Sequence, residues 1–107
     1  MVIKFKNLFS FKKSEIKEAF EGAQFKAKGP GLKLLQSKSS LEHGKILIII
    51  PKRAGKASKR NKFRRQVKSI FFHEKLYEKP IISILLVYED AMELTFEQTK
   101  TFLKDNL

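Results

Sequence analysis

The chain of 107 residues contains no cysteine and no tryptophan, and it has only two histidines. Disulfide bonds and thiolate metal sites are therefore excluded. Neither His43 nor His73 has the partner spacing of a zinc motif, so we expect no metal bound by the protein itself. No apolar run approaches the ~20 residues that span a bilayer, and residues 1–13 lack a signal-peptide core. We expect no membrane partner and a cytoplasmic location.

Acidic residues are missing from the middle of the chain. No Asp or Glu lies between Lys45 and His73. A paired-carboxylate site or a carboxylate–metal nuclease site is hard to build without them. Glu15, Glu18 and Glu21 follow each other at spacing three, which we interpret as a surface row. The sequence also has no glycine-rich phosphate loop and no nucleophile elbow, so we predict no catalytic residue in this chain.

Positive charge is abundant. The formal net charge is +12 and the sequence pI is about 10.0. Such a balance is typical of proteins that bind RNA, DNA or an anionic membrane surface. Residues 89–107 hold five acids and only two lysines. We therefore expect the surface that binds a polyanion to lie outside this C-terminal part.

The charge is concentrated in residues 52–72, which we predict to form a basic helix entered through a turn at Gly55. At 100° per residue, one apolar stripe gathers the side chains expected to face the core: Phe63, Val67, Ile70 and Phe71. Arg60, Arg64 and Lys68 form a row along the edge of this stripe. We expect the side chains further round to point to solvent: Asn61, Arg65 and Phe72.

Two interpretations of this basic segment are open. Like charges at i and i+4 destabilise an isolated helix by roughly 0.2–0.5 kcal/mol per pair, and a bound polyanion would offset that cost. The alternative is a solvated face that only keeps the protein soluble. Solvated faces usually intersperse acids among the bases, and this segment has none. We therefore favour nucleic-acid binding.

Hydrophobic patterning predicts a single α+β domain over residues 1–107. We expect an irregular arm over 1–13, a helix capped by Ser14 and ended at Gly22, and strands over 24–28, 32–36, 46–50 and 81–88. In the first strand, Phe25 and Ala27 should share one side. The run 46–50 is apolar throughout, as in a strand buried on both faces. Thr95 and Gln98 match a capping box that begins the last helix.

The predicted order is α-β-β-β-α-β-α, a sandwich of helices on a four-stranded sheet. The strands over 46–50 and 81–88 flank the basic helix, so they should pair in parallel.

The segment over residues 52–65, KRAGKASKRNKFRR, resembles the signature of the protein subunit of bacterial ribonuclease P. Lys62 stands where the family has the second arginine of Arg-Asn-Arg, which keeps the charge but loses the planar fork. Residues 16–22 are similar to the first helix of the family, with Ile16 in place of a phenylalanine and Phe20 matching the next one. Residues 94–100 are similar to its last helix.

The resemblance implies a fold like the second domain of ribosomal protein S5, with a left-handed βαβ crossover. It also implies a function: the RNA subunit cuts precursor tRNA to free the mature 5′ end, and Mg²⁺ is held mainly by that RNA. The partners implied are the catalytic RNA and precursor tRNA, and we infer no obligate protein partner.

By position, the resemblance assigns two sets of residues in this sequence. The contacts to RNA are Lys52, Arg53, Lys56, Lys59, Arg60, Asn61, Lys62, Arg64, Arg65 and Lys68. The contacts to the single-stranded 5′ leader are Phe20, Lys33 and Leu35. The alternative is a basic ribosomal protein that binds structured RNA without turnover. A protein nuclease is disfavoured because the carboxylates and histidines it needs are missing.

Overall fold

The computed structural model describes residues 4–107, so residues 1–3 of the expected N-terminal arm lie outside it. The helices are α1 (Lys13–Glu21), α2 (Ala57–His73) and α3 (Phe96–Asn106). The strands are β1 (Gln24–Gly29), β2 (Leu32–Lys38), β3 (Lys45–Ile49) and β4 (Ile81–Val87). Short 3-10 turns lie at η1 (Phe5–Leu8), η2 (Lys52–Ala54), η3 (Leu76–Glu78) and η4 (Glu89–Glu93). The predicted α+β class and element order are confirmed.

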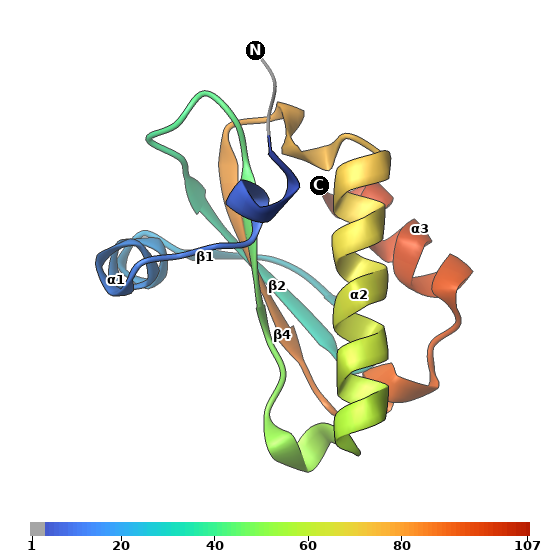
Figure 1. Cartoon of the computed structure of the whole chain (residues 1–107). Helices are drawn as coiled ribbons and strands as arrows, with labels where there is room; N and C mark the ends of the chain where they lie inside the picture. The colour runs from blue at the N-terminus through green and yellow to red at the C-terminus, as the bar shows by residue number, and fades with distance from the viewer. Residues whose placement is uncertain (1–3) are drawn as a thin grey trace.

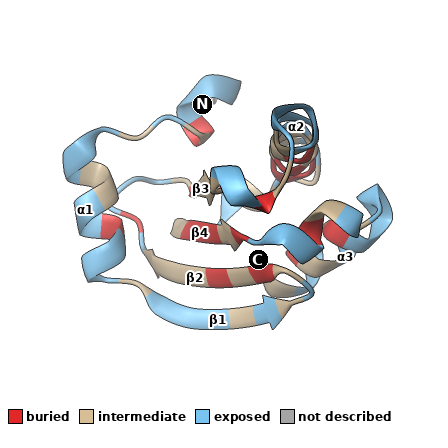
Figure 2. Ribbon diagram, turned by 90° about the horizontal axis from the view of Figure 1, so that it is seen from below, coloured by how far each residue is buried: buried red, intermediate tan, exposed pale blue. Residues whose placement is uncertain are grey.

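The four strands form one mixed sheet in the order β1-β2-β4-β3. β1 pairs antiparallel with β2, β2 pairs antiparallel with β4, and β3 pairs parallel with β4. Helix α1 lies on one side of the sheet, and α2 and α3 lie on the other (Figure 1). The crossover from β3 through α2 to β4 is left-handed when Figures 1 and 2 are followed together, as the resemblance implied. Few βαβ units have this hand.

The hydrophobic core fills the space between the sheet and helices α2 and α3 (Figure 2). Leu34 and Leu85, which are cross-strand partners, are both fully buried. The predicted stripe of α2 is confirmed, because each member is at most 4% exposed: Phe63, Val67, Ile70 and Phe71. Burial of such a side chain stabilises the fold by about 1.5–3 kcal/mol. The apolar stripe therefore fixes α2 firmly on the sheet.

Strand β3 differs from the expectation of full burial. It is an edge strand, because the sheet order ends with it. Lys45 and Ile46 at its start are buried, whereas Leu47, Ile48 and Ile49 are only half-buried. The turn η1 packs beside β3. The apolar run therefore identified a strand correctly but did not identify its place in the sheet.

Three local expectations have different outcomes. Ser14 is not the cap of α1: the N-cap position is Lys12, whose backbone N–H donates to Glu15 Oε1 at 3.0 Å. The capping box of α3 is confirmed, since Gln98 N–H donates to Thr95 Oγ1 at 3.1 Å. The solvent-facing position expected for Phe72 is wrong. Its ring is half-buried and lies against Phe5, with the ring centroids 5.2 Å apart.

A buried lysine joins α1 to the sheet. The side chain of Lys45 is 7% exposed, and its Nζ lies 3.1 Å from Glu15 Oε2 and 4.3 Å from the centroid of the Phe11 ring. The same Nζ donates to the backbone oxygen of Ser10. Because Ala19 is the single buried residue of α1, this polar contact is a main attachment of that helix. Glu15 is therefore not only a member of the predicted surface row but also the partner of a buried charge.

We expect Glu15→Gln to weaken the fold by about 1–2 kcal/mol at neutral pH, because Lys45 stays buried without its counter-charge. The Lys12 backbone N–H and then the Lys45 hydrogen bond hold the pKa of Glu15 below its usual 4.5. A lowered folded-state pKa gives stability that is present above pH 4.5 and is lost as the pH falls. Urea unfolding at pH 7 and pH 3.5 should show the gap to wild type closing in acid. Glu18→Gln, at an exposed position on the same helix, serves as the control, and an equal gap at both pH values would contradict this role.

Candidate nucleic-acid interface

The side of α2 next to the apolar stripe carries a row of three half-buried cations, Arg60, Arg64 and Lys68. Arg60 Nε donates to the backbone oxygen of Gly55 at 3.0 Å. Arg64 Nη1 donates to Asn61 Oδ1 at 3.1 Å, which places the predicted Asn61 beside this row. Lys68 Nζ lies 5.4 Å from the centroid of the Phe9 ring. These contacts restrain each cation with a neutral group, which leaves its charge available to an anion.

The basic segment enters α2 through a turn at Gly55, as predicted, so the helix does not extend over the whole of residues 52–72. Lys52 and Arg53 lie in the turn η2, Gly55 follows that turn, and α2 begins only at Ala57. Lys56 occupies the N-cap position of α2, where no side chain caps the helix. All three of these basic residues are exposed. They surround a helix N-terminus, whose free N–H groups and dipole also attract anions.

The opposite side of α2 carries a second group of cations. Lys59 and Lys62 are exposed and line a hollow of about 220 Å³ between α2 and the start of α3, together with Phe96. Arg65 is exposed and belongs to neither side, since its helical position points away from the sheet. The predicted RNA contacts therefore spread over three sides of α2 and over the turn before it. Lys62, which stands where the family signature has an arginine, lies on the side of α2 away from Arg60 and Arg64.

The chain's own carboxylates do not neutralise this surface. Within residues 4–107, the ion pairs are Lys17–Glu21, Lys45–Glu15, Lys100–Glu74 and Lys104–Glu74. None of them includes a predicted RNA contact. Glu74 follows α2 directly but pairs with α3, and the Lys104 hydrogen bond lowers the pKa of its carboxyl. The positive field along α2 is therefore uncompensated.

The second predicted set lies on the other side of the sheet. Lys33 and Leu35 alternate with the buried Leu32 and Leu34, so they face away from the core, and both are half-buried. We call this surface, which α1 covers at one end, the open face. Phe20, on the last turn of α1, is 42% exposed. The two predicted sets thus occupy opposite layers (Figure 1), and the β3 edge lies between them.

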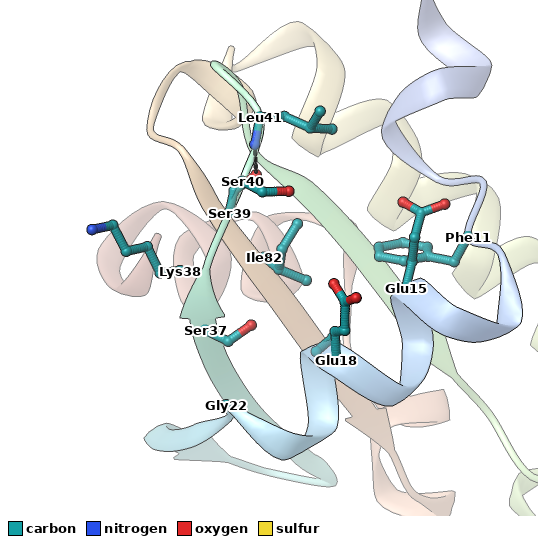
Figure 3. Close-up of a pocket in the computed structure, with 11 residues that line it drawn as sticks. Phe11, Glu15, Glu18, Gly22, Ser37, Lys38, Ser39, Ser40, Leu41 and Ile82 are labelled. Carbon is teal, nitrogen blue, oxygen red and sulfur yellow. Dashed lines mark hydrogen bonds between the residues drawn. The ribbon is translucent and has the colours of Figure 1, made fainter.

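Acidic side chains run along the length of α1, at Glu15, Glu18 and Glu21. A hollow of about 260 Å³ lies between α1 and the chain that follows β2, and Figure 3 shows Glu15 and Glu18 in its wall. The hollow carries charges of both signs, because Lys38 also lines it and Glu15 is paired with Lys45. It therefore attracts phosphate less than a surface that carries only lysines. Phosphates are better accommodated on the part of the open face around Lys33, where the charged side chains are lysines.

Phe25 is an exposed aromatic residue that sequence reasoning placed wrongly. We predicted that it shares a side with Ala27, but the register shifts between the two residues through a β-bulge. Phe25 pairs with Leu35 on the open face, whereas Ala27 pairs with Leu34 and packs against the core. Phe25 is 61% exposed. An irregular strand gives no clear signal in the alternation of side chains, which is why the sequence did not reveal it.

Neither a metal site nor a membrane span is evident in the part of the chain that the structure describes. Residues 4–107 contain no group of three histidine or acidic side chains that could hold a metal ion. No helix within this range is both long enough and apolar enough to cross a bilayer. A cationic helix on one layer and an aromatic, lysine-bearing sheet face on the other are the features of a small basic α+β protein that binds nucleic acid.

Comparison with known proteins identifies the family to which the chain belongs within this class. The sequence model of the family described as Ribonuclease P matches residues 6–107. A structure of the RNase P protein from Staphylococcus aureus has a TM-score of 0.79 and 17% identity, covering 92% of this chain and 91% of that one. The Thermotoga maritima RNase P protein in complex with 1-(4-fluorophenyl)-2-thiourea has a TM-score of 0.73 and 20% identity, covering 84% and 88%. No curated protein matches the chain significantly in sequence.

The chain belongs to the ribonuclease P protein family. It is the protein subunit of ribonuclease P, the ribonucleoprotein that removes the 5′ leader of precursor tRNA, and in this family the RNA subunit carries the catalysis. The prediction from residues 52–65 is thereby confirmed, and the alternative of a ribosomal protein is set aside. The individual contact residues remain predictions.

We expect Arg60→Ala and Arg64→Ala each to weaken binding of the catalytic RNA and to flatten its salt dependence. Each lost phosphate contact should reduce the slope of log K against log salt by roughly 0.7–0.9. Filter binding from low to high salt measures the slope. Lys104→Ala, which removes one charge from α3, is the charge-matched control. Slopes equal to that of the control would remove both arginines from the interface.

Proposed function

We propose that this subunit binds two RNAs through its two layers. The cationic surface of α2 and η2 binds the catalytic RNA, and the open face binds the single-stranded leader of precursor tRNA. The observation that supports this most directly is the uncompensated positive charge of α2, a helix whose other side is firmly packed on the sheet. A surface that carries charge without its own counter-ions gains most from a polyanion.

Counterion release supplies the binding free energy at the cationic surface. Each lysine or arginine that neutralises a phosphate releases a condensed cation from the RNA. Arg60 and Arg64 can hold phosphates in a bidentate way, and their hydrogen bonds to Gly55 and Asn61 orient both guanidinium groups beforehand. The lysines act as point charges and add affinity with less geometric selection. All ten predicted residues take part in this proposal: Lys52, Arg53, Lys56, Lys59, Arg60, Asn61, Lys62, Arg64, Arg65 and Lys68.

The open face suits a single strand better than a duplex. Unpaired bases can stack on exposed rings, and a lysine beside the ring can meet the phosphate. Phe20 supplies a ring on α1, Lys33 a cation and Leu35 an apolar contact, and all three are accessible. Because the leader alone distinguishes precursor from mature tRNA, binding at this face would favour substrate over product.

We assign Mg²⁺ mainly to the catalytic RNA, as membership of the ribonuclease P protein family implies. The chain contributes positive charge, which reduces repulsion between the two RNAs and so lowers the Mg²⁺ concentration that their association needs. The catalytic RNA and precursor tRNA are sufficient partners in this proposal, and the cytoplasm is the compartment in which the complex would act.

Reconstitution tests the function as a whole. The catalytic RNA with this protein should cleave precursor tRNA at a low Mg²⁺ concentration at which the RNA alone is nearly inactive. The expected gain is largest at low Mg²⁺ and shrinks as Mg²⁺ rises, because added cations replace the protein's charge. Cleavage by the protein alone, or no gain at any Mg²⁺ concentration, would show the proposal to be wrong.

Phe20→Ala should weaken binding of precursor tRNA by the reconstituted complex by roughly fivefold or more, the free energy of about one base–aromatic stack. Affinity for tRNA without a leader should not change. Equilibrium binding of both substrates measures the two effects, and Phe20→Tyr, which keeps the ring, is the control. Equal losses on both substrates would show that the ring serves packing of α1 instead.

A further inference from the structure

We propose that Phe25 is a second stacking site for the leader, which extends the leader-binding surface outward onto strand β1. This inference rests on the proposed function of the open face, and it adds a residue and a position along the RNA to it. The occupant is a single-stranded RNA segment upstream of the nucleotides that lie over Leu35.

The first argument is exposure. Phe25 is 61% exposed, more than any other large apolar side chain in residues 4–107. A single exposed apolar residue needs no explanation, but Phe25 is not isolated. Its cross-strand partner is Leu35, and α1, which carries Phe20, ends only three residues before β1 begins. Phe20 and Phe25 are therefore two accessible rings on consecutive elements of the chain, α1 and β1.

The second argument is the β-bulge that turns this ring to the open face. Uninterrupted alternation would place Phe25 on the same side as Ala27, toward the core. The bulge between them reverses the side on which Phe25 lies and leaves Lys26 between the two paired positions. Bulges often redirect a side chain for a function. Here the result is a large ring in solvent and a small residue against the core.

The third argument is charge. Lys33 Nζ lies 6.0 Å from the centroid of the Phe25 ring, and Lys28 is the cross-strand partner of Lys33. No acid lies between Gly22 and Leu41. A ring flanked by lysines provides a stacking surface for a base and cations for its phosphates. The same lysines are unfavourable beside an apolar peptide, so the chemistry favours a nucleotide.

The order of the strands gives the position along the leader. The sheet runs β1-β2-β4-β3, and α2 lies nearer the β3 edge than the β1 edge (Figure 2). Lys68 of α2 lies over the ring of Phe9, which follows the turn η1 that packs beside β3. An RNA strand that starts near α2 and crosses the open face from the β3 edge meets β3 first, then β4 and β2, and β1 last. Phe25 would therefore meet leader nucleotides farther from the cleavage site than those at Leu35.

The test uses the reconstituted complex and a series of precursor tRNAs whose leaders lengthen by one nucleotide at a time. For wild type, affinity should rise with leader length and then level off. For Phe25→Ala, affinity for leaderless and short-leader substrates should be unchanged, and the curve should level off at a shorter leader. The plateau affinity should be lower by about 5- to 150-fold, the range for one base–aromatic stack.

Two variants separate stacking from general apolar contact. Phe25→Tyr keeps the aromatic ring and should follow the wild-type curve. Phe25→Leu keeps an apolar side chain but has no ring, and it should follow Phe25→Ala. Single 2-aminopurine substitutions along the leader add a direct measurement: fluorescence at one outer position should be quenched with wild type and recover with Phe25→Ala.

The outcomes distinguish this inference from the proposed function. If wild type shows no dependence on leader length, the leader-binding role of the open face is wrong. If wild type shows the dependence and Phe25→Ala has the same curve, the role of Phe25 alone is wrong. An equal loss on leaderless tRNA, or wild-type behaviour of Phe25→Leu, would also overturn stacking at this residue.

Discussion

The packing of one apolar stripe against the sheet makes the rest of this structure possible. Nine basic residues lie close together in and before α2, and their mutual repulsion opposes helix formation. Phe63, Val67, Ile70 and Phe71 offset that repulsion, because each is buried against the core. A helix so attached can keep its other sides cationic without acids of its own. Burial of the core side chains thus offsets the charge repulsion within α2, and the cationic surface that results can be stabilised further by an anionic partner.

The left-handed crossover determines which face of the sheet stays accessible. With the same strand order and directions, a right-handed connection would place α2 on the opposite face. There it would cover Lys33 and Leu35 and enclose Phe25. The observed hand instead stacks α2 and α3 together on one face and leaves the other to α1, which covers only part of it (Figure 2). Two accessible surfaces on opposite layers, the cationic sides of α2 and the open face, follow from this handedness.

Local periodicity accounts for what could be predicted from the sequence. The stripe of α2, the Thr95 capping box and the strand over 81–88 depend on neighbouring residues, and all three appear in the structure. The charge row of α2 was also predictable, because a regular helix fixes its positions. The resemblance over residues 52–65 then identified the family, which amino-acid composition alone does not identify.

The features that could not be predicted depend on contacts between distant segments. Lys45 is separated from Glu15 by 30 residues, and nothing near either one indicates the pairing. The bulge at Lys26 breaks the regular alternation of side chains, so the sequence pattern could not show that Phe25 lies on the open face. The edge position of β3 depends on the pairing of all four strands, so an apolar run could not reveal it.

The bulge in β1 has a further consequence, which concerns solubility. β1 is an outer strand of the sheet, and an outer strand exposes backbone groups that can pair with another molecule. The irregular backbone at Lys26 interrupts that row of groups, and the exposed Lys26 and Lys28 add charge to it. The strand that presents an exposed phenylalanine is therefore also protected against edge-to-edge aggregation.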